Sequence, residues 1–92
     1  MQTKKIVVNT PHGMHMRFAG EIMQKARSCS SSVMLRRGAA SANGRSIIEL
    51  LLLDAPEGAE LELLVDGSDE EAVIMEIERI FLQGAPSNPR GG

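Results

Sequence analysis

The residues best suited to do chemistry lie in one short stretch, His12-Gly13-Met14-His15-Met16-Arg17-Phe18-Ala19. Within it, His15 and Arg17 stand two residues apart, where an expected strand gives way to an expected helix. Imidazole is a good nucleophile that titrates near neutrality, and a guanidinium binds phosphate through two parallel hydrogen bonds. A helix start adds unpaired N–H groups and a partial positive charge, which favour a bound anion. The stretch therefore predicts a histidine that accepts and holds a phosphoryl group.

A phosphoryl group on His15 is expected to lie against the backbone N–H groups of Met16 and Arg17, with the Arg17 side chain compensating its charge. The competing interpretation makes His15 an ordinary surface or helix-capping histidine. His12 is expected to be a solvated turn residue, whose ring would add charge near the phosphate when protonated. Two histidines close in sequence, with Cys29 at the far end of the expected helix, do not make a metal site. We therefore expect no metal and no cofactor.

Hydrophobic periodicity defines the elements that must position these residues. A first strand is expected over residues 4–9, and Pro11 and Gly13 then mark a turn. Residues 16–27 carry apolar side chains at helical spacing and predict an amphipathic helix, which the short polar side chains of 28–32 end. Alternation predicts a second strand at 33–36 and a weaker third strand at 39–42. The candidate histidine thus falls between the first strand and the first helix.

The second half of the chain predicts a short helix, a strand and a longer helix. Ser46 and Glu49 have the spacing of a capping box, so residues 46–53 are expected to form the short helix. Strict alternation of apolar and polar residues over 59–66 predicts the clearest strand of the chain.

The last helix is expected to begin at Ser68 and Glu71, which repeat the capping-box spacing, and to end at Gly84. Its expected buried stripe consists of Val73, Ile77, Ile80 and Phe81. Residues 85–92 are rich in Pro, Ser and Gly and are expected to be a disordered tail, which leaves residues 1–84 as one domain. The order βαββαβα, with one buried sheet face and three helices to cover it, predicts an α+β two-layer sandwich.

Composition excludes several classes of function. The chain has 92 residues and a formal charge of −2, without the basic stripe of a nucleic-acid binder, and its aromatic residues are two phenylalanines. A single cysteine, Cys29, excludes an internal disulfide and fits a reducing compartment. No long apolar segment follows Lys4 and Lys5, so we expect neither a signal peptide nor a membrane span. These features predict a soluble, cytoplasmic domain.

Two motifs carry a resemblance to a known family. The run Gly13-Met14-His15-Met16-Arg17-Phe18-Ala19 resembles the Gly-Leu-His-Ala-Arg-Pro-Ala motif of the histidine-containing phosphocarrier proteins, HPr, of the bacterial phosphoenolpyruvate-dependent phosphotransferase system. The run Asn43-Gly44-Arg45-Ser46-Ile47-Ile48-Glu49-Leu50 is similar to the family's second motif, commonly Lys-Ser-Ile-Met-Gly-Leu. Length and element order also match, so the resemblance covers roughly the whole chain before the tail.

The resemblance implies a fold and a function. The implied fold is an open-faced sandwich, in which three helices cover one side of a four-stranded antiparallel sheet. The implied function is that of a phosphoryl carrier and not of a turnover enzyme: His15 accepts a phosphoryl group from phospho-enzyme I, and the protein passes it to IIA domains of sugar permeases. A carrier that visits several partners is expected to be a monomer.

The implied docking face comprises the first helix and the short second helix. A helix that packs on a sheet buries one side only, so some of the apolar residues in 47–53 are expected to be exposed, and exposed apolar patches mark binding sites. We expect Ile48 and Leu51 at the centre of this face. Its expected members are Met16, Gly20, Met23, Gln24, Arg27, Ile47, Ile48 and Leu51.

Ser46 has two interpretations. In Gram-positive members of the family, the matching serine is phosphorylated by a dedicated kinase, whereas the simpler interpretation is a helix cap supported by Glu49. The family often has glycine where Glu49 stands. A phosphate on Ser46 would meet the Glu49 carboxylate within one turn, and like charges repel.

Three departures from the family pattern surround the candidate site. Met14 replaces a usual leucine, Met16 replaces a smaller residue, and Phe18 replaces a proline. With Phe18, an additional N–H becomes available near the phosphate, while the preset backbone angle of proline is lost. These changes leave open a specialised paralogue that serves regulation or a nitrogen-type branch rather than sugar uptake.

Two rival functions come from other classes. One is an interaction module of the same fold in which His15 is not used, so that binding is indifferent to its replacement. The other is a small hydrolase of a different α+β fold, such as an acylphosphatase. That chemistry needs a glycine-rich phosphate cradle, which the loop around Gly13 does not supply.

Overall fold

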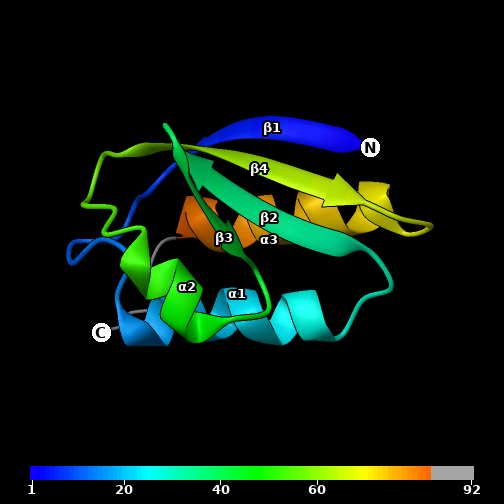
Figure 1. The fold of residues 1–92 in the computed structure, drawn as a ribbon, viewed down its shortest axis with the longest axis horizontal. Coiled ribbons are helices and arrows are strands. Elements are labelled where there is room, and N and C mark those ends of the chain that lie inside the picture. The colour runs from blue at the N-terminus through cyan, green and yellow to red at the C-terminus, as the bar shows by residue number, and fades with distance from the viewer. Residues whose placement is uncertain (84–92) are drawn as a thin grey trace.

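The computed structural model describes residues 1–83, which form an antiparallel sheet and three helices in the order βαββαβα (Figure 1). The strands are β1 (Gln2–Val7), β2 (Ser32–Arg37), β3 (Ala40–Asn43) and β4 (Glu60–Asp66). The helices α1 (Met16–Arg27), α2 (Ile47–Leu52) and α3 (Glu70–Gln83) all lie on one face of the sheet. The predicted open-faced sandwich is therefore confirmed. The predicted helix end at Gly84 and the predicted tail 85–92 lie outside the described residues.

The sheet has the strand order β1-β4-β2-β3, with every neighbouring pair antiparallel. The alternation that predicts β4 is confirmed, because Leu61, Leu63 and Val65 are almost fully buried on the helix-covered face. Leu63 lies opposite Leu35 of β2 on that face. The two central strands thus supply the sheet side of the core, and β1 and β3 form its edges.

Helix α1 has the predicted bounds. Of its apolar residues at helical spacing, Met23 is partly buried, and the others are buried: Phe18, Ala19, Ile22 and Ala26. In α3 the buried residues are Val73, Ile74, Ile77 and Phe81, whereas Ile80, which we expect in the buried stripe, is only partly buried against the core. Ile80 lies beside Gln24 and Lys25 at the surface seam between α3 and α1. Ile74, one residue after Val73, takes the fourth buried position instead.

All four strands differ by one or two residues from their predicted bounds, and β1 and β3 are shifted along the chain. Strand β1 begins at Gln2 because Gln2 and Thr3 pair with β4, which their own side chains do not reveal. It ends at Val7, although Val8 remains buried and exchanges hydrogen bonds with the 58–59 turn. Strand β3 begins at Ala40, one residue later than expected, because the β2–β3 turn at Gly38 has positive φ.

Two capping boxes are predicted, at the starts of α2 and α3, and the structure confirms only the serine cap of α2. At α2, Ser46 Oγ accepts the N–H of Glu49 at 3.2 Å, as predicted, but the Glu49 carboxylate accepts from the N–H of Asn43 and not from that of Ser46. At α3, the predicted start is wrong by one residue. The helix begins at Glu70, whose carboxylate accepts the N–H of Gly67 at 3.0 Å, and this bond lowers the pKa of Glu70.

Asp69 explains why the start of α3 is shifted. Its carboxylate accepts hydrogen bonds from the N–H of Ser30, at 2.9 Å, and from the hydroxyl of Ser31. Ser31 is fully buried and needs such a partner, because a buried hydroxyl without one is costly. The Asp69 side chain therefore binds the loop that follows α1. The hydrogen bonds from Ser30 and Ser31 lower the pKa of the Asp69 carboxyl group.

Candidate functional site

His15 occupies the N-cap position of α1. Its backbone is extended, with φ of −103° and ψ of 172°, and its carbonyl accepts the N–H of Ala19 at 2.8 Å. Its side chain makes no capping hydrogen bond, and the first turn of α1 holds no acidic residue. The N–H groups of that turn lack helical acceptors, as at any helix start. Their partial positive charge is therefore left uncompensated beside His15.

The imidazole of His15 is half-buried, and a buried hydroxyl lies at one of its edges. Nε2 is 3.3 Å from Oγ1 of Thr10, which is fully buried. Within residues 1–83, Nδ1 makes no hydrogen bond, so it is the ring nitrogen left open for chemistry. If Nε2 carries the proton and donates it to Thr10, Nδ1 has a lone pair available for attack. Thr10 is not among the predicted site residues, although a small polar residue at the end of a strand, just before a turn, is a signal visible in the sequence.

Two other aromatic rings lie near the imidazole of His15. The His12 ring is 5.9 Å away between ring centroids, in an edge-to-face arrangement with an interplanar angle of 77°. The Phe18 ring is 6.3 Å away, and it packs edge-to-face against Phe81 of α3 at 4.9 Å. Phe18 is fully buried, so the residue that replaces the family's proline is part of the core.

The loop before His15 is held by a second loop. Gly13 has φ of +67°, and a Cβ at this position would clash with the carbonyl oxygen of Ala55 and lie 2.8 Å from Cα of Pro56. The next residue, Met14, donates its N–H to the same Ala55 oxygen at 2.7 Å. Only glycine combines this backbone angle with so close an approach. The turn that follows α2 therefore fixes the backbone that carries His15.

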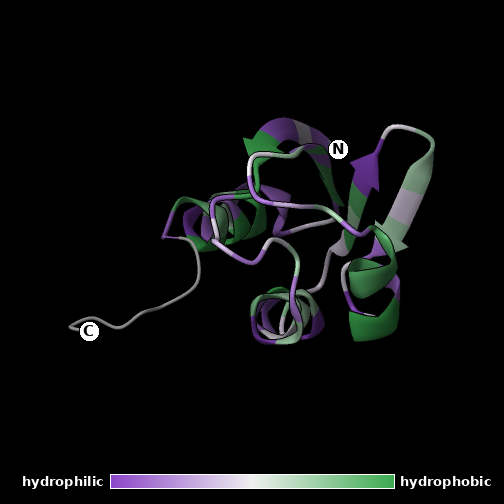
Figure 2. Cartoon of the chain, turned by 90° about the vertical axis from the view of Figure 1, so that its left-hand side faces the viewer, coloured by the Kyte–Doolittle hydropathy of each residue, from purple (hydrophilic) through white to green (hydrophobic). Residues whose placement is uncertain are grey.

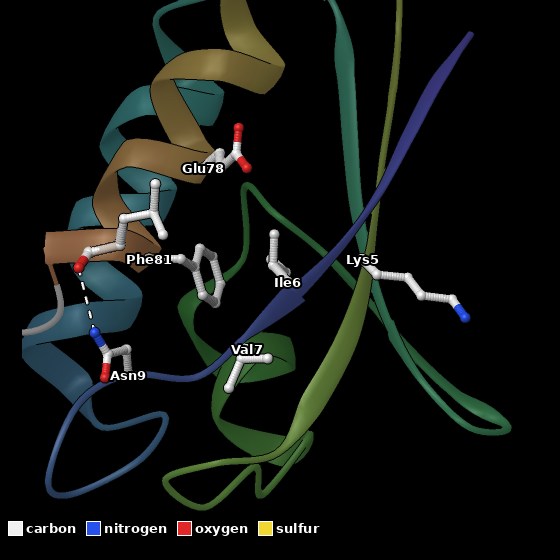
Figure 3. A pocket seen from close by; sticks show the side chains of 7 residues that line it. Lys5, Ile6, Val7, Asn9, Glu78 and Phe81 are labelled. Atoms are coloured by element: carbon white, nitrogen blue, oxygen red, sulfur yellow. Dashed lines mark hydrogen bonds between the residues drawn. The ribbon is translucent and has the colours of Figure 1, made fainter.

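A further contact anchors the loop to α3 (Figure 3). Asn9 donates its side-chain N–H to the carbonyl oxygen of Leu82 at 3.2 Å. It lies beside a pocket of about 360 Å³, where Ile6 and Phe81 point into the space between β1 and α3 and Lys5 points away. None of the predicted site residues lines this pocket. We therefore regard the residues around this pocket as a support for the loop before His15.

Arg17 lies two residues after His15, in the first turn of α1, and is exposed. Its guanidinium makes no hydrogen bond or ion pair with the residues that the structure describes. The side chain is thus free to follow a phosphate on His15, as the sequence predicts for it.

The predicted docking face contains exposed apolar side chains on two neighbouring helices. Met16 on α1 is 67% exposed and Ile48 on α2 is 71% exposed. Leu51, which we expect at the centre, is partly buried against the core, as is Ile47. The more exposed residue is Leu52, at 76%, which lies one helical turn after Ile48 and which the sequence analysis did not select. In Figure 2 the ribbon of α2, coloured mostly as hydrophobic, lies beside that of α1.

The other predicted members of the face differ in exposure. Gly20 and Met23 are partly buried, whereas Gln24 and Arg27 are exposed. The structure brings the two helices together through Arg45, whose guanidinium donates to the carbonyl oxygens of Ala26, at 2.9 Å, and of Cys29 and Ser31, at 3.1 Å each. The turn that precedes α2 is thereby fixed to the end of α1.

The described residues offer neither a metal centre nor a membrane-spanning helix. Among residues 1–83, no group of three or more His, Cys, Asp and Glu side chains is arranged to hold a metal ion. None of the described helices is long and apolar enough to cross a membrane.

The fold and the site together define a small open-faced α+β sandwich of the phosphocarrier type, with a histidine at the start of its first helix. A family model described as the PTS HPr component phosphorylation site matches residues 2–83. The chain belongs to this family, the HPr phosphocarriers of the phosphotransferase system.

Individual relatives agree with this assignment. The phosphocarrier protein HPr of Treponema pallidum is 40% identical over 81 residues, which cover 88% of this chain and 92% of that protein. HPr of Lysinibacillus sphaericus is 32% identical over 71 residues, covering 77% of this chain and 81% of the relative. A crystal structure of HPr from Thermoanaerobacter tengcongensis superposes with a TM-score of 0.86 at 25% identity, over 90% of this chain and 93% of that one.

Proposed function

We propose that this protein carries a phosphoryl group on Nδ1 of His15, accepting it from phospho-enzyme I and passing it to IIA domains, as a cytoplasmic monomer. The observation that carries the proposal is the geometry of His15. The ring stands at an uncapped helix start, with Nε2 beside the buried hydroxyl of Thr10 and Nδ1 open. Membership in the HPr family supports the identity of the donor and of the acceptor.

The transfer step exchanges one P–N bond for another. The lone pair of His15 Nδ1 attacks phosphorus, and the P–N bond to the donor histidine breaks. The electron pair of the broken bond returns to the donor imidazole, which takes up a proton. The new phosphoimidazole loses its positive charge when Nε2 releases its proton. The onward step to an acceptor histidine repeats this sequence with His15 as the donor, so the protein ends each cycle unchanged and acts as a carrier.

The surroundings of His15 suit a group that must be held and then released. The N–H groups of Met16 and Arg17 and the Arg17 guanidinium supply positive charge to the phosphoryl oxygens. Both the helix start and the guanidinium lie at the surface, where water screens them, so the group is not bound too tightly to leave.

Docking by this carrier rests on the exposed apolar side chains near the site. We assign Met16, Ile48 and Leu52 to the face that contacts enzyme I and the IIA domains, because large exposed apolar residues on adjacent helices favour protein contact. The same face serves donor and acceptor in turn, since both must reach His15.

Ser46 is the basis of the alternative, regulatory function. Its hydroxyl is engaged as the cap of α2, and the carboxylate of Glu49 is bound to the N–H of Asn43 in the same turn. A phosphate on Ser46 would break this cap and meet the Glu49 charge. These contacts favour the cap, and they make the His15 carrier the better-supported function.

The test is a relay experiment with purified components. The protein is labelled from radioactive phosphoenolpyruvate by enzyme I, separated from the donor, and mixed with a IIA domain. We expect the label to move to the IIA domain from the wild type and from His12→Gln, the matched histidine control. We expect no label on His15→Ala. Transfer through His15→Ala at the wild-type rate would contradict the proposal.

A further inference from the structure

His12 is the ionisable residue of this site that the carrier function leaves without a role. Its side chain is exposed, and its ring meets the His15 ring edge-to-face at 5.9 Å between centroids. The loop that carries it is fixed on both sides. Gly13 donates its N–H to the carbonyl of Thr10 at 2.9 Å, and Gly13 itself lies against Ala55 and Pro56. The backbone that places His12 beside His15 is therefore fixed by the fold.

Phosphorylation changes what the His12 ring faces, because a dianionic group then occupies the edge of the neighbouring ring. Opposite charges on two neighbouring side chains attract each other at a protein surface, where the effective dielectric constant is about 20. A protonated imidazole also offers two N–H donors and no acceptor, which suits phosphoryl oxygens. We propose that protonated His12 is a charge-compensating residue for the phosphoryl group on His15 and makes the lifetime of that group depend on pH.

Other charges near the loop do not duplicate this role. Arg17 in the first turn of α1 carries a charge that does not change with pH in the physiological range. Asp54 and Glu57 belong to the turn that packs on Gly13, and neither is hydrogen-bonded or ion-paired to His12.

Glu78 of α3 pairs with Lys4 at 3.2 Å and is thereby directed to β1. Arg17 thus supplies a positive charge near the phosphoryl group that is constant with pH, and His12 supplies the positive charge that varies with pH. An imidazole is ordinarily protonated below about pH 6.5.

The expected effect is on hydrolysis of the phosphorylated protein. Water attacks phosphorus, the P–N bond breaks, and the electron pair returns to His15, which takes up a proton as inorganic phosphate leaves. If the transition state is loose, negative charge moves from the phosphoryl oxygens toward the departing ring. A cation beside those oxygens then stabilises the phosphorylated state more than the transition state, and hydrolysis slows.

The experiment compares wild type, His12→Gln and His12→Lys, each phosphorylated chemically with phosphoramidate. Both variants retain His15 as their one histidine, and in the wild type the species phosphorylated at His15 alone is isolated by anion exchange and identified by fragment mass. First-order hydrolysis rates are measured at pH 5.5 and pH 8.0 at low ionic strength. Comparison at the same pH cancels the intrinsic pH dependence of phosphohistidine. Circular dichroism confirms that each variant is folded.

At pH 5.5 we expect His12→Gln to hydrolyse about threefold faster than the wild type, the size of an exposed charge interaction. At pH 8.0 the two rates should converge, while His12→Lys stays slow at both pH values. Equal rates for wild type and His12→Gln at pH 5.5 would overturn the proposal, as would a His12→Lys variant that behaves like His12→Gln.

The inference rests on His15 as the phosphoacceptor of the proposed function, but its test is separate. Phosphoramidate loads His15 without a protein donor, so the comparison does not depend on enzyme I. Failure of enzyme I to phosphorylate the wild type would count against the carrier function and leave the measured effect of His12 intact.

Discussion

The hydroxyl of Thr10 is fully buried and lies 3.3 Å from Nε2 of His15, at the inner edge of the half-buried ring. Such a contact orients the imidazole and selects the nitrogen that carries its proton. In the proposed mechanism this leaves Nδ1 as the nucleophile. The reactivity of Nδ1 therefore depends on the buried hydroxyl of Thr10.

Replacement of Thr10 tests this dependence. We expect Thr10→Val, which keeps the shape and removes the hydroxyl, to lower the rate constant for phosphorylation of His15 by enzyme I about fivefold, the loss of one hydrogen bond. Thr10→Ser, which retains the hydroxyl, should stay close to the wild type. The rate is measured by rapid quench, and a Thr10→Val variant as fast as the wild type would show that the hydroxyl does not orient the ring.

Gly13 offers a second test at the scale of one residue. Gly13→Ala must place a Cβ against Ala55 and Pro56 at a φ of +67°, and we expect it to lower the free energy of unfolding by about 3 kcal/mol. Gly38→Ala is the matched control, because Gly38 has φ of +58° and open space around it, so it should cost about 1 kcal/mol. Urea unfolding measures both. Equal losses would mean that the clash with the second loop relaxes without cost.

The elements were predictable from the sequence where their signals are local. The apolar spacing of α1 and the alternation of β4 each depend on one segment, and the structure confirms both. The start of β1 depends on pairing with β4, and the start of α3 depends on Asp69 serving a distant loop. Contacts between segments far apart in sequence therefore account for these two differences.

In the candidate site, too, some residues can be identified from the local sequence and others only from the fold. His15 and Arg17 stand out by type and spacing, and the structure places both at the start of α1. The role of Thr10 depends on how the strand exit folds back against the ring, and spacing alone does not show this. The exposure of Leu52 in place of Leu51 depends on how α2 is rotated on the core.

The Asp69 contact predicts a pH dependence at the scale of two elements. Because its folded pKa is lowered by Ser30 and Ser31, Asp69 stabilises the fold fully above its unfolded value of about 3.9. That stabilisation is lost as the pH falls through the lower folded pKa. Asp69→Asn should therefore unfold at lower urea concentration than the wild type at pH 7, with a difference that shrinks toward pH 2.5. A difference that is independent of pH would contradict this account.

At the scale of the whole molecule, the framework holds one exposed apolar area next to one reactive ring. Arg45 ties the turn before α2 to the end of α1, and the turn after α2 fixes the loop of His15. The proposed docking face and the proposed acceptor atom are therefore held by one connected framework.

Charge placed on that face should impair docking without impairing the fold. We expect Ile48→Asp and Leu52→Asp each to lower kcat/KM for phosphorylation by enzyme I at least about tenfold, as for loss of an apolar anchor. Met75→Asp on α3, where Met75 is 62% exposed, is the matched control and should have little effect. All three should unfold near the wild-type urea midpoint. A similar loss in Met75→Asp would move the docking surface to another face.

The most direct test of the central claim is intact-mass analysis after incubation with phosphoenolpyruvate and enzyme I from the same organism. Wild type should gain a single phosphoryl adduct that is labile in acid and stable in base, as phosphohistidine is, and His15→Ala should gain none. The carrier assignment would be contradicted by a wild type that stays unmodified beside a working control carrier. An adduct that persists in His15→Ala would contradict the assignment of the site.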